Sequence, residues 1–205
     1  SRVFDFGSGS YDNNIRVSNN GGAGGIGWYI NSGEGGGVEK GLISSSEFAL
    51  SAWTHLVVTI QGTTMALYKD GILVGTMIDG LEPNVMTRAN HIIGASDWDG
   101  MGLFMKGTIG YMRIWHGIGL EQSKVSDLYQ LSCTPGTYYE SATGLCTDCP
   151  VDTYSESWGS STCTSCPSGK THFVTASPSA SDCSHDSIHS WNFIDCTDGV
   201  PLVDD

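Results

Sequence analysis

The sequence predicts an all-β fold in which a β-sandwich is followed by a small cysteine-rich module. Between positions 53 and 115, short runs of β-branched, apolar and aromatic residues recur at intervals of about 8–12 residues, which is typical of a sandwich. No helical period is present in this region. Six of the seven cysteines then lie between positions 133 and 183, in a stretch rich in Ser, Thr and Gly.

The central hairpin is the most clearly predicted element. Residues 65–69 and 72–77 are predicted as strands, and Asp70-Gly71 between them is a strong signal for a two-residue type I′ loop. Other strands are expected at 2–6, 15–17, 26–30, 55–60, 91–94, 103–106 and 108–115. After them, the spacing of apolar residues within 120–129 predicts a short amphipathic helix or turn that closes the sandwich.

The charge balance restricts the possible partners. Nine basic residues stand against 22 acidic ones, and the formal net charge of −13 disfavours contact with phosphate backbones and anionic membranes. We therefore expect no nucleic-acid partner and, because no run of about 18 apolar residues is present, no direct membrane insertion. No basic-then-apolar leader begins at Ser1, so we expect a processed or partial segment of a longer protein.

Several motifs, in order along the chain, resemble one known family. They are Phe4-Asp5-Phe6-Gly7, Asp12-Asn13, Trp53-Thr54-His55, the LYKDG turn at 67–71, Asn90-His91-Ile92-Ile93-Gly94, Ser96-Asp97-Trp98 and the run from Gly107 to Trp115. In these motifs the chain resembles laminin-G-like domains of the concanavalin A-like lectin/glucanase superfamily. The resemblance implies a jelly-roll sandwich over residues 1–131, used for extracellular binding of glycans or proteins, often with a calcium ion near the rim.

The end of the chain resembles the start of another such domain. Family members open with a Trp/Phe strand, which does not precede the motif at 2–7 but has a counterpart in 187–193. We therefore expect residues 1–131 to lack the first strands of their sandwich, and 185–205 to supply the opening strand of a further domain. The chain then comes from a tandem array, in which 188–193 pairs with a sandwich outside this segment, either the next domain or a neighbouring copy.

The cysteine spacing allows two interpretations. The Cys-x-x-Cys pairs at 146/149 and 163/166 are separated by the thirteen residues 150–162, which also fits a zinc ribbon. The surrounding stretch has almost no basic or large apolar residues to build a core. This composition favours disulfides, because a small module without a core needs covalent links.

Residues 132–184 resemble the ephrin-receptor-like cysteine-rich module. The unit Cys149-Pro150-Val151-Asp152-Thr153-Tyr154-Ser155 follows the family pattern, except that Asp152 replaces a glycine. The resemblance implies sequential pairing, Cys133–Cys146, Cys149–Cys163 and Cys166–Cys183, and hence an oxidising compartment. Cys196 is the odd cysteine, and we expect it to form a disulfide with the domain that follows.

No catalytic motif is present. Glucanases of this superfamily carry Glu-x-Asp-x-x-Glu on one strand, and that motif is absent, as is a Gly-x-Ser-x-Gly elbow. The candidate binding site is a calcium position at the sandwich rim, since Asp97 and Asp99 lie two apart and Asp12 with Asn13 offers more oxygen ligands. The alternative is that these aspartates form only Asx turns.

These observations predict a non-catalytic, architectural or adhesive segment of a large secreted or cell-surface protein, such as a fibre or flagellar-hair component. Its expected partners are neighbouring domains or copies of the same protein, other extracellular proteins, or glycans. The alternative function is a calcium-dependent glycan-binding lectin module, in which Tyr11 or Trp98 would stack on a sugar.

Overall fold

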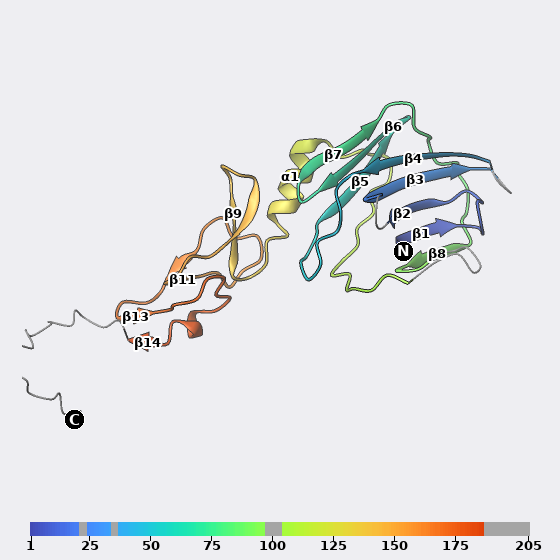
Figure 1. The fold of residues 1–205 in the computed structure, drawn as a ribbon. Helices are drawn as coiled ribbons and strands as arrows, with labels where there is room; N and C mark the ends of the chain where they lie inside the picture. The colour runs from blue at the N-terminus through green and yellow to red at the C-terminus, as the bar shows by residue number, and fades with distance from the viewer. Residues whose placement is uncertain (21–23, 34–36, 97–103, 187–205) are drawn as a thin grey trace, which may run out of the picture. The chain divides into compact units, whose positions relative to one another are not determined.

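The computed structural model describes residues 1–20, 24–33, 37–96 and 104–186, which form two compact units. The first unit holds Ser1–Ser132 together with Ser141–Leu145, and the second holds the rest of the chain from Cys133 onward. Figure 1 shows the sheets of the first unit in blue to green and the small strands of the second in orange to red.

A five-stranded antiparallel sheet forms one layer of the first unit, in the order β4-β3-β2-β1-β8. Its strands are β1 Arg2–Gly7, β2 Ile15–Asn19, β3 Ile26–Ser32, β4 Val38–Ser44 and β8 Asn90–Ile93. The register places Phe4, Val17, Trp28 and Leu42 in one row across four strands. Since side chains alternate along a strand, this row and its neighbours two residues away share the face that builds the core.

A three-stranded antiparallel sheet, in the order β5-β6-β7, forms the other layer. Its strands are β5 Leu56–Gln61, β6 Thr64–Lys69 and β7 Ile72–Met77. The Asp70-Gly71 loop has φ values of 50° and 77°, so the predicted hairpin with positive φ at both loop positions is confirmed. Met65 and Leu67 join the buried residues of the other sheet in a single core, and the predicted all-β sandwich is confirmed.

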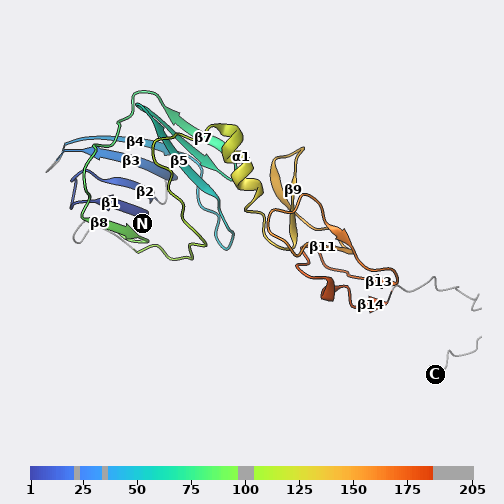
Figure 2. The same ribbon diagram turned by 180° about the vertical axis from the view of Figure 1, so that it is seen from behind.

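The predicted helix is α1, Gln122–Gln130, which packs on the outer face of the three-stranded sheet. Val125 is fully buried there against Val57, Ala66 and Tyr68. At the Asp70-Gly71 turn between β6 and β7, Gln122 Nε2 donates to the carbonyl oxygen of Gly71 at 2.6 Å. Figure 2 shows the helix from behind, beside β7.

Two differences from the predicted strands stand out. Strand β4 is not predicted from the sequence, because its exposed and buried residues alternate only weakly. The strands predicted at 103–106 and 108–115 are wrong for the residues that the structure describes, because 104–118 contains no strand. A strand pattern becomes a strand only when its backbone forms a ladder with a neighbour, and within the described residues this segment belongs to no sheet, although Met105 N–H donates to Gly94 O.

The second unit is held together by three disulfides. They are Cys133–Cys146, Cys149–Cys163 and Cys166–Cys183, the pairs that the resemblance implied. The disulfide interpretation is therefore confirmed over the zinc ribbon. The remaining elements are short: β9 Thr137–Glu140, β10 Leu145–Asp148, β11 Thr153–Tyr154, β12 Thr164–Ser165, β13 Lys170–Thr171, a 3₁₀ helix Ala180–Asp182 and β14 His185–Asp186.

Candidate functional site

The sandwich is open along one side because its two sheets differ in width. Within the residues that the structure describes, one sheet has five strands and the other three, and β4 at the edge of the wider sheet packs on β7 and β6. At the opposite end of the wider sheet, β1 and β8 therefore extend past β5, where the narrower sheet ends. Ile93 of β8 shares the core-facing side with its register partner Phe4, yet Ile93 is 54% exposed. The core is thus uncovered beside β5 and β8.

The edge of the narrower sheet at this opening is β5. Gln61 and Thr64 flank a two-residue loop and therefore form a hydrogen-bonded pair. Hydrogen-bonded and non-hydrogen-bonded pairs alternate along an antiparallel ladder, so Ile60, Val58 and Leu56 belong to non-hydrogen-bonded pairs. Leu56, Val58 and Ile60 consequently direct their backbone N–H and C=O groups away from β6. No backbone hydrogen bond from the described residues reaches these groups. Their side chains contact the core but are only half-buried, whereas the core-facing residues of β6 are fully buried.

Residues 104–118, which we name the apolar strip, cross the open side. The strip starts beside β8, where the Met105 N–H donates to Gly94 O at 2.7 Å. It ends beside β5, where a Cβ added to Gly119 would lie 3.2 Å from Ile60 O. In Figure 1 it is the yellow-green trace that runs outside both sheets.

The apolar strip exposes most of its large side chains. Its exposed residues range from 37% to 77% accessible: Phe104, Ile109, Tyr111, Met112, Ile114, Trp115 and Ile118. Single exposed apolar residues are common on protein surfaces, but a continuous run of this kind marks a contact surface for another chain or segment. The strip contains Lys106 and Arg113 and no acidic residue, in a chain whose net charge is −13.

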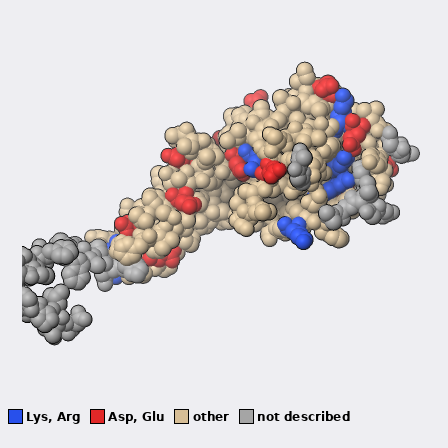
Figure 3. Space-filling model, viewed as in Figure 1, with Lys and Arg blue, Asp and Glu red and all other residues tan. Residues whose placement is uncertain are grey.

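Charged side chains on the five-stranded sheet are paired with one another. Arg2 Nη1 lies 2.6 Å from Asp5 Oδ2, and Arg16 Nη1 lies 2.6 Å from Glu39 Oε2. The Arg16 guanidinium also stacks 4.3 Å from the centre of the Tyr29 ring. Figure 3 shows basic and acidic groups close together over this part of the molecule. Arg2 and Arg16 are both buried, and each is paired with a carboxylate.

At the rim, Asp12 and Asn13 belong to a closed hydrogen-bond network. Asn13 Oδ1 accepts from Gly33 N at 3.0 Å and from Asn84 Nδ2 at 2.8 Å, and Arg88 Nε donates to Asn13 O at 2.8 Å. Burial lowers the pKa of Arg88 below its usual range. The amide oxygen of Asn13 thus accepts two hydrogen bonds, and calcium binding by Asp12 and Asn13 stays a prediction.

Four other residues that the sequence predicts to be functional lie outside the described part of the chain: Asp97, Trp98, Asp99 and Cys196. Calcium binding and the disulfide between Cys196 and the following domain therefore stay predictions. Tyr11 is described, with φ of 56° and 42% exposure, next to the rim network. Within the described ranges, no three His, Cys, Asp or Glu side chains gather closely enough to hold a metal ion.

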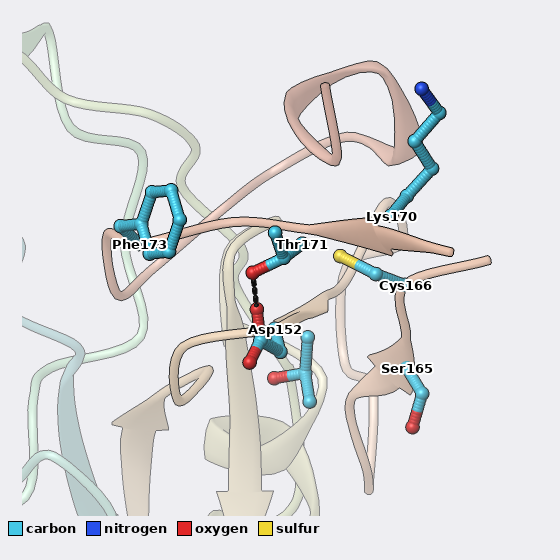
Figure 4. Close-up of a pocket in the computed structure, with 7 residues that line it drawn as sticks. Asp152, Ser165, Cys166, Lys170, Thr171 and Phe173 are labelled. Atoms are coloured by element: carbon cyan, nitrogen blue, oxygen red, sulfur yellow. Dashed lines mark hydrogen bonds between the residues drawn. The ribbon is translucent and has the colours of Figure 1, made fainter. Parts of the chain in front are cut away.

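A pocket of about 520 Å³ lies in the second unit, lined by Asp152, Thr153, Ser165, Cys166, Lys170, Thr171 and Phe173. Asp152 Oδ1 accepts hydrogen bonds from the Thr171 hydroxyl and from His172 N, which join the β11 turn to β13. These bonds hold the pKa of Asp152 below its usual range. In Figure 4 the Lys170 and Phe173 side chains point away from this carboxylate, so the residues do not converge on one ligand.

Sequence reasoning missed the open side. In the sequence, Leu56, Val58 and Ile60 alternate with residues that face the helix or are polar. This pattern predicts a strand, but it is the same for a strand at the edge of a sheet and for one in its middle. Only the spatial order of the strands shows that β5 is an edge.

Comparisons with known proteins agree with this architecture. A family model described as the concanavalin A-like lectin/glucanases superfamily, of laminin G type, matches residues 1–126. A second, described as tyrosine-protein kinase ephrin type A/B receptor-like, matches residues 136–183. No curated protein matches the chain.

Among solved structures, an S-layer domain-containing protein of Clostridium thermocellum (residues 221–444) is similar to this chain. The two share 23% sequence identity with a TM-score of 0.36, over 63% of this chain and 62% of that one. The match therefore spans less than two thirds of the solved chain. No helix in the described part of the chain is long and apolar enough to cross a membrane.

Proposed function

The chain belongs to the concanavalin A-like lectin/glucanases superfamily, and from this membership we propose that it is a non-catalytic, adhesive or architectural segment of an extracellular multi-domain protein. The observation that carries the proposal is the open side of the sandwich, where the free edge of β5 and the apolar strip lie together. Such a surface suits protein contacts better than turnover of a small substrate, which needs an enclosed pocket with converging polar groups.

The second unit supports an extracellular setting. Three disulfides close loops with sequence separations of 13, 14 and 17 residues in a module with few buried apolar residues. Disulfides of this density persist in oxidising compartments and are rare where thiols are kept reduced. The assembly that we propose is a fibre or surface appendage, of which flagellar hair is one example, built from neighbouring domains or copies of the same protein.

Surface labelling tests this proposal. Antibodies raised against the full chain are expected to label intact, unpermeabilised cells of the source organism or the matrix that they shed. Labelling that requires permeabilisation would contradict the extracellular assignment. Release of product from a panel of polysaccharides by the purified chain would contradict the non-catalytic assignment.

A calcium-dependent lectin is the second candidate function. It is favoured by the exposed aromatic ring of Tyr11 beside the Asp12 carboxylate at the rim, because aromatic rings and carboxylates are common contacts for sugars. A glycan array with and without a chelator separates the two functions. Reproducible hits that disappear with chelator, and that are lost in Asp97→Ala, would favour the lectin over the architectural segment.

A further inference from the structure

We propose that the second unit is a link of nearly fixed length that carries tension along the chain through its disulfides. This inference rests on the proposed architectural function, because a fibre or surface appendage transmits force from one end of each segment to the other. The first unit has no cysteine before Cys133, so the sandwich is the part of the chain that lengthens under load.

The sequential pairing of the cysteines gives the second unit a short covalent route from one end to the other. The route enters at Cys133, crosses the three disulfides in turn and leaves at Cys183. Between the disulfides it follows the backbone only through 146–149 and 163–166. The loops that lie beside the route are 134–145, 150–162 and 167–182. A force applied at the two ends of the route therefore does not stretch these loops.

The two backbone segments of the route have little slack. Residues 146–148 lie in β10 and residues 164–165 form β12. A β-strand rises about 3.3 Å per residue, which is close to the limit of a fully stretched chain. Tension therefore cannot lengthen these segments by much. The disulfides that join them span Cα–Cα distances of 5.5, 5.7 and 5.6 Å.

The covalent route sets an upper limit on the length of the second unit. Pulled straight, it measures about 40 Å from Cys133 to Cys183, at about 3.5 Å for each backbone step. Without disulfides the same stretch would reach about 175 Å, so the three loops account for a difference of about 135 Å. The sandwich has no such shortcut, and residues 1–131 would reach about 450 Å when they are fully stretched.

The disulfides are shielded in a regular way. In each pair one cysteine is buried and its partner is half-buried. The buried cysteines are Cys133, Cys149 and Cys183. Disulfide exchange requires a thiolate to reach a sulfur atom, so enclosing one cysteine of each pair restricts attack to the other. This restriction suits bonds that hold a permanent load.

Hydrogen bonds between the loops shape the unit without limiting its stretched length. Gly136 N donates to Ser155 O at 2.7 Å, and Ser155 N donates to Ser177 O at 3.1 Å. Inside the last loop, the buried Ser177 hydroxyl donates to Asp182 Oδ2 at 2.6 Å. These bonds lie outside the covalent route, so breaking them changes the stability of the unit and leaves its greatest length the same.

Single-molecule force spectroscopy tests the proposal on the full chain, purified without reductant and held by tags at its two ends. The wild-type chain is expected to lengthen when the sandwich unfolds, and the second unit should give no separate step at lower force. With reductant, the fully stretched chain should be about 135 Å longer, because the three loops then enter the route.

Two variants separate the covalent route from the hydrogen bonds. Cys149→Ser/Cys163→Ser removes the middle disulfide and is expected to add about 45 Å to the fully stretched chain. The matched control Ser177→Ala loses its bond to Asp182 but no covalent link, and its stretched length should equal that of the wild type. Because stretched length does not depend on folding, the comparison holds even if the cysteine variant does not fold.

Three results would overturn the proposal. The first is a wild-type chain whose stretched length does not increase with reductant, and the second is a cysteine variant no longer than Ser177→Ala. The third is a lengthening step of the second unit at a lower force than that of the sandwich, which would make the unit a compliant spring. Surface labelling of intact cells tests the proposed function separately, since labelling does not depend on how the chain responds to force.

Discussion

At the scale of single residues, the buried charge of Asp5 in the sandwich is compensated by neighbouring donors. Asp5 is fully buried and accepts from Arg2 Nη1 at 2.6 Å and from Asn14 Nδ2 at 3.1 Å. Desolvation lowers the pKa of Arg2, and the Asp5 carboxylate acts in the opposite direction. Removing one partner of such a pair leaves an uncompensated charge, which costs more than the pair itself contributes.

His55 makes the first unit sensitive to acid. Its ring lies 5.6 Å from the Tyr129 ring of α1, and no partner among the described residues reaches Nδ1. Burial lowers the pKa of His55 below 6.5, although Asp70 opposes the shift. The stability that this neutral side chain contributes is present above pH 6.5 and is lost as pH falls below it. Urea midpoints should therefore decrease below pH 6.5, and less so in His55→Gln; equal slopes would contradict this.

Asp152 stands where the module family has a glycine, and its φ of 63° explains the preference. Its carboxylate compensates by accepting from Thr171 and His172. We expect Asp152→Ala to lower the melting temperature of the module more than Asp152→Gly, because alanine loses the hydrogen bonds and keeps the backbone strain. Thr171→Val is the control that removes the hydroxyl donor alone. Equal melting temperatures for alanine and glycine would show that backbone strain is unimportant here.

At the scale of elements, the β6–β7 hairpin and α1 depend on each other. The Gly71 carbonyl accepts from Gln122 Nε2 at 2.6 Å and from Ser126 Oγ at 3.4 Å, and the Tyr129 ring covers the Gly71 α-carbon. The loop that sets the strand register therefore also positions the helix. This coupling explains why a helix of nine residues is stable, since isolated helices of this length are marginal in water.

Two glycine substitutions measure this coupling. Gly62 has φ of 57° with no atom within 4 Å of an added Cβ, whereas at Gly71, with φ of 77°, the Cβ would lie 2.9 Å from Tyr129 Cδ1. Gly62→Ala is expected to destabilise the sandwich by about 1 kcal/mol through backbone strain alone. Gly71→Ala should cost about 1–3 kcal/mol more because it also displaces Tyr129. Similar free energies of unfolding for the two variants would contradict the coupling.

At the scale of the whole molecule, the two units derive their stability from different sources. The first unit has a core shared by two sheets and no cysteine before Cys133. The second has small two-stranded sheets, and Cys133, Cys149 and Cys183 are among its few buried residues. Burial of apolar surface therefore stabilises the first unit, and restriction of the unfolded chain stabilises the second.

Reduction should separate the two units in calorimetry. Each disulfide contributes about 3 kcal/mol in the chain-entropy account, so a reductant is expected to abolish the transition of the second unit. The transition of the first unit should keep its midpoint. A zinc chelator is the control and should change neither transition. A first transition that also shifts with reductant would contradict independent stabilisation.

The sequence by itself determined the features that depend on neighbouring residues. The Asp70-Gly71 loop, the alternation in β1, β3 and β5, the apolar spacing of α1 and the cysteine spacing are all local signals. Each reflects the backbone preference of a few residues or the periodicity of one element. The pairing of the cysteines came from family resemblance, since six cysteines alone allow 15 connectivities.

The tertiary structure decided what depends on partners distant in the sequence. Residues 108–115 have the pattern of a strand but form none. Only the structure shows that the side-chain oxygen of Asn13 accepts from Gly33 and Asn84. In the described part of the chain, the open side follows from the facing of five strands by three. The physical reason is the same in each case: a hydrogen-bonding group can be assigned a role only when its partner in space is known, and alternation along one strand does not identify that partner.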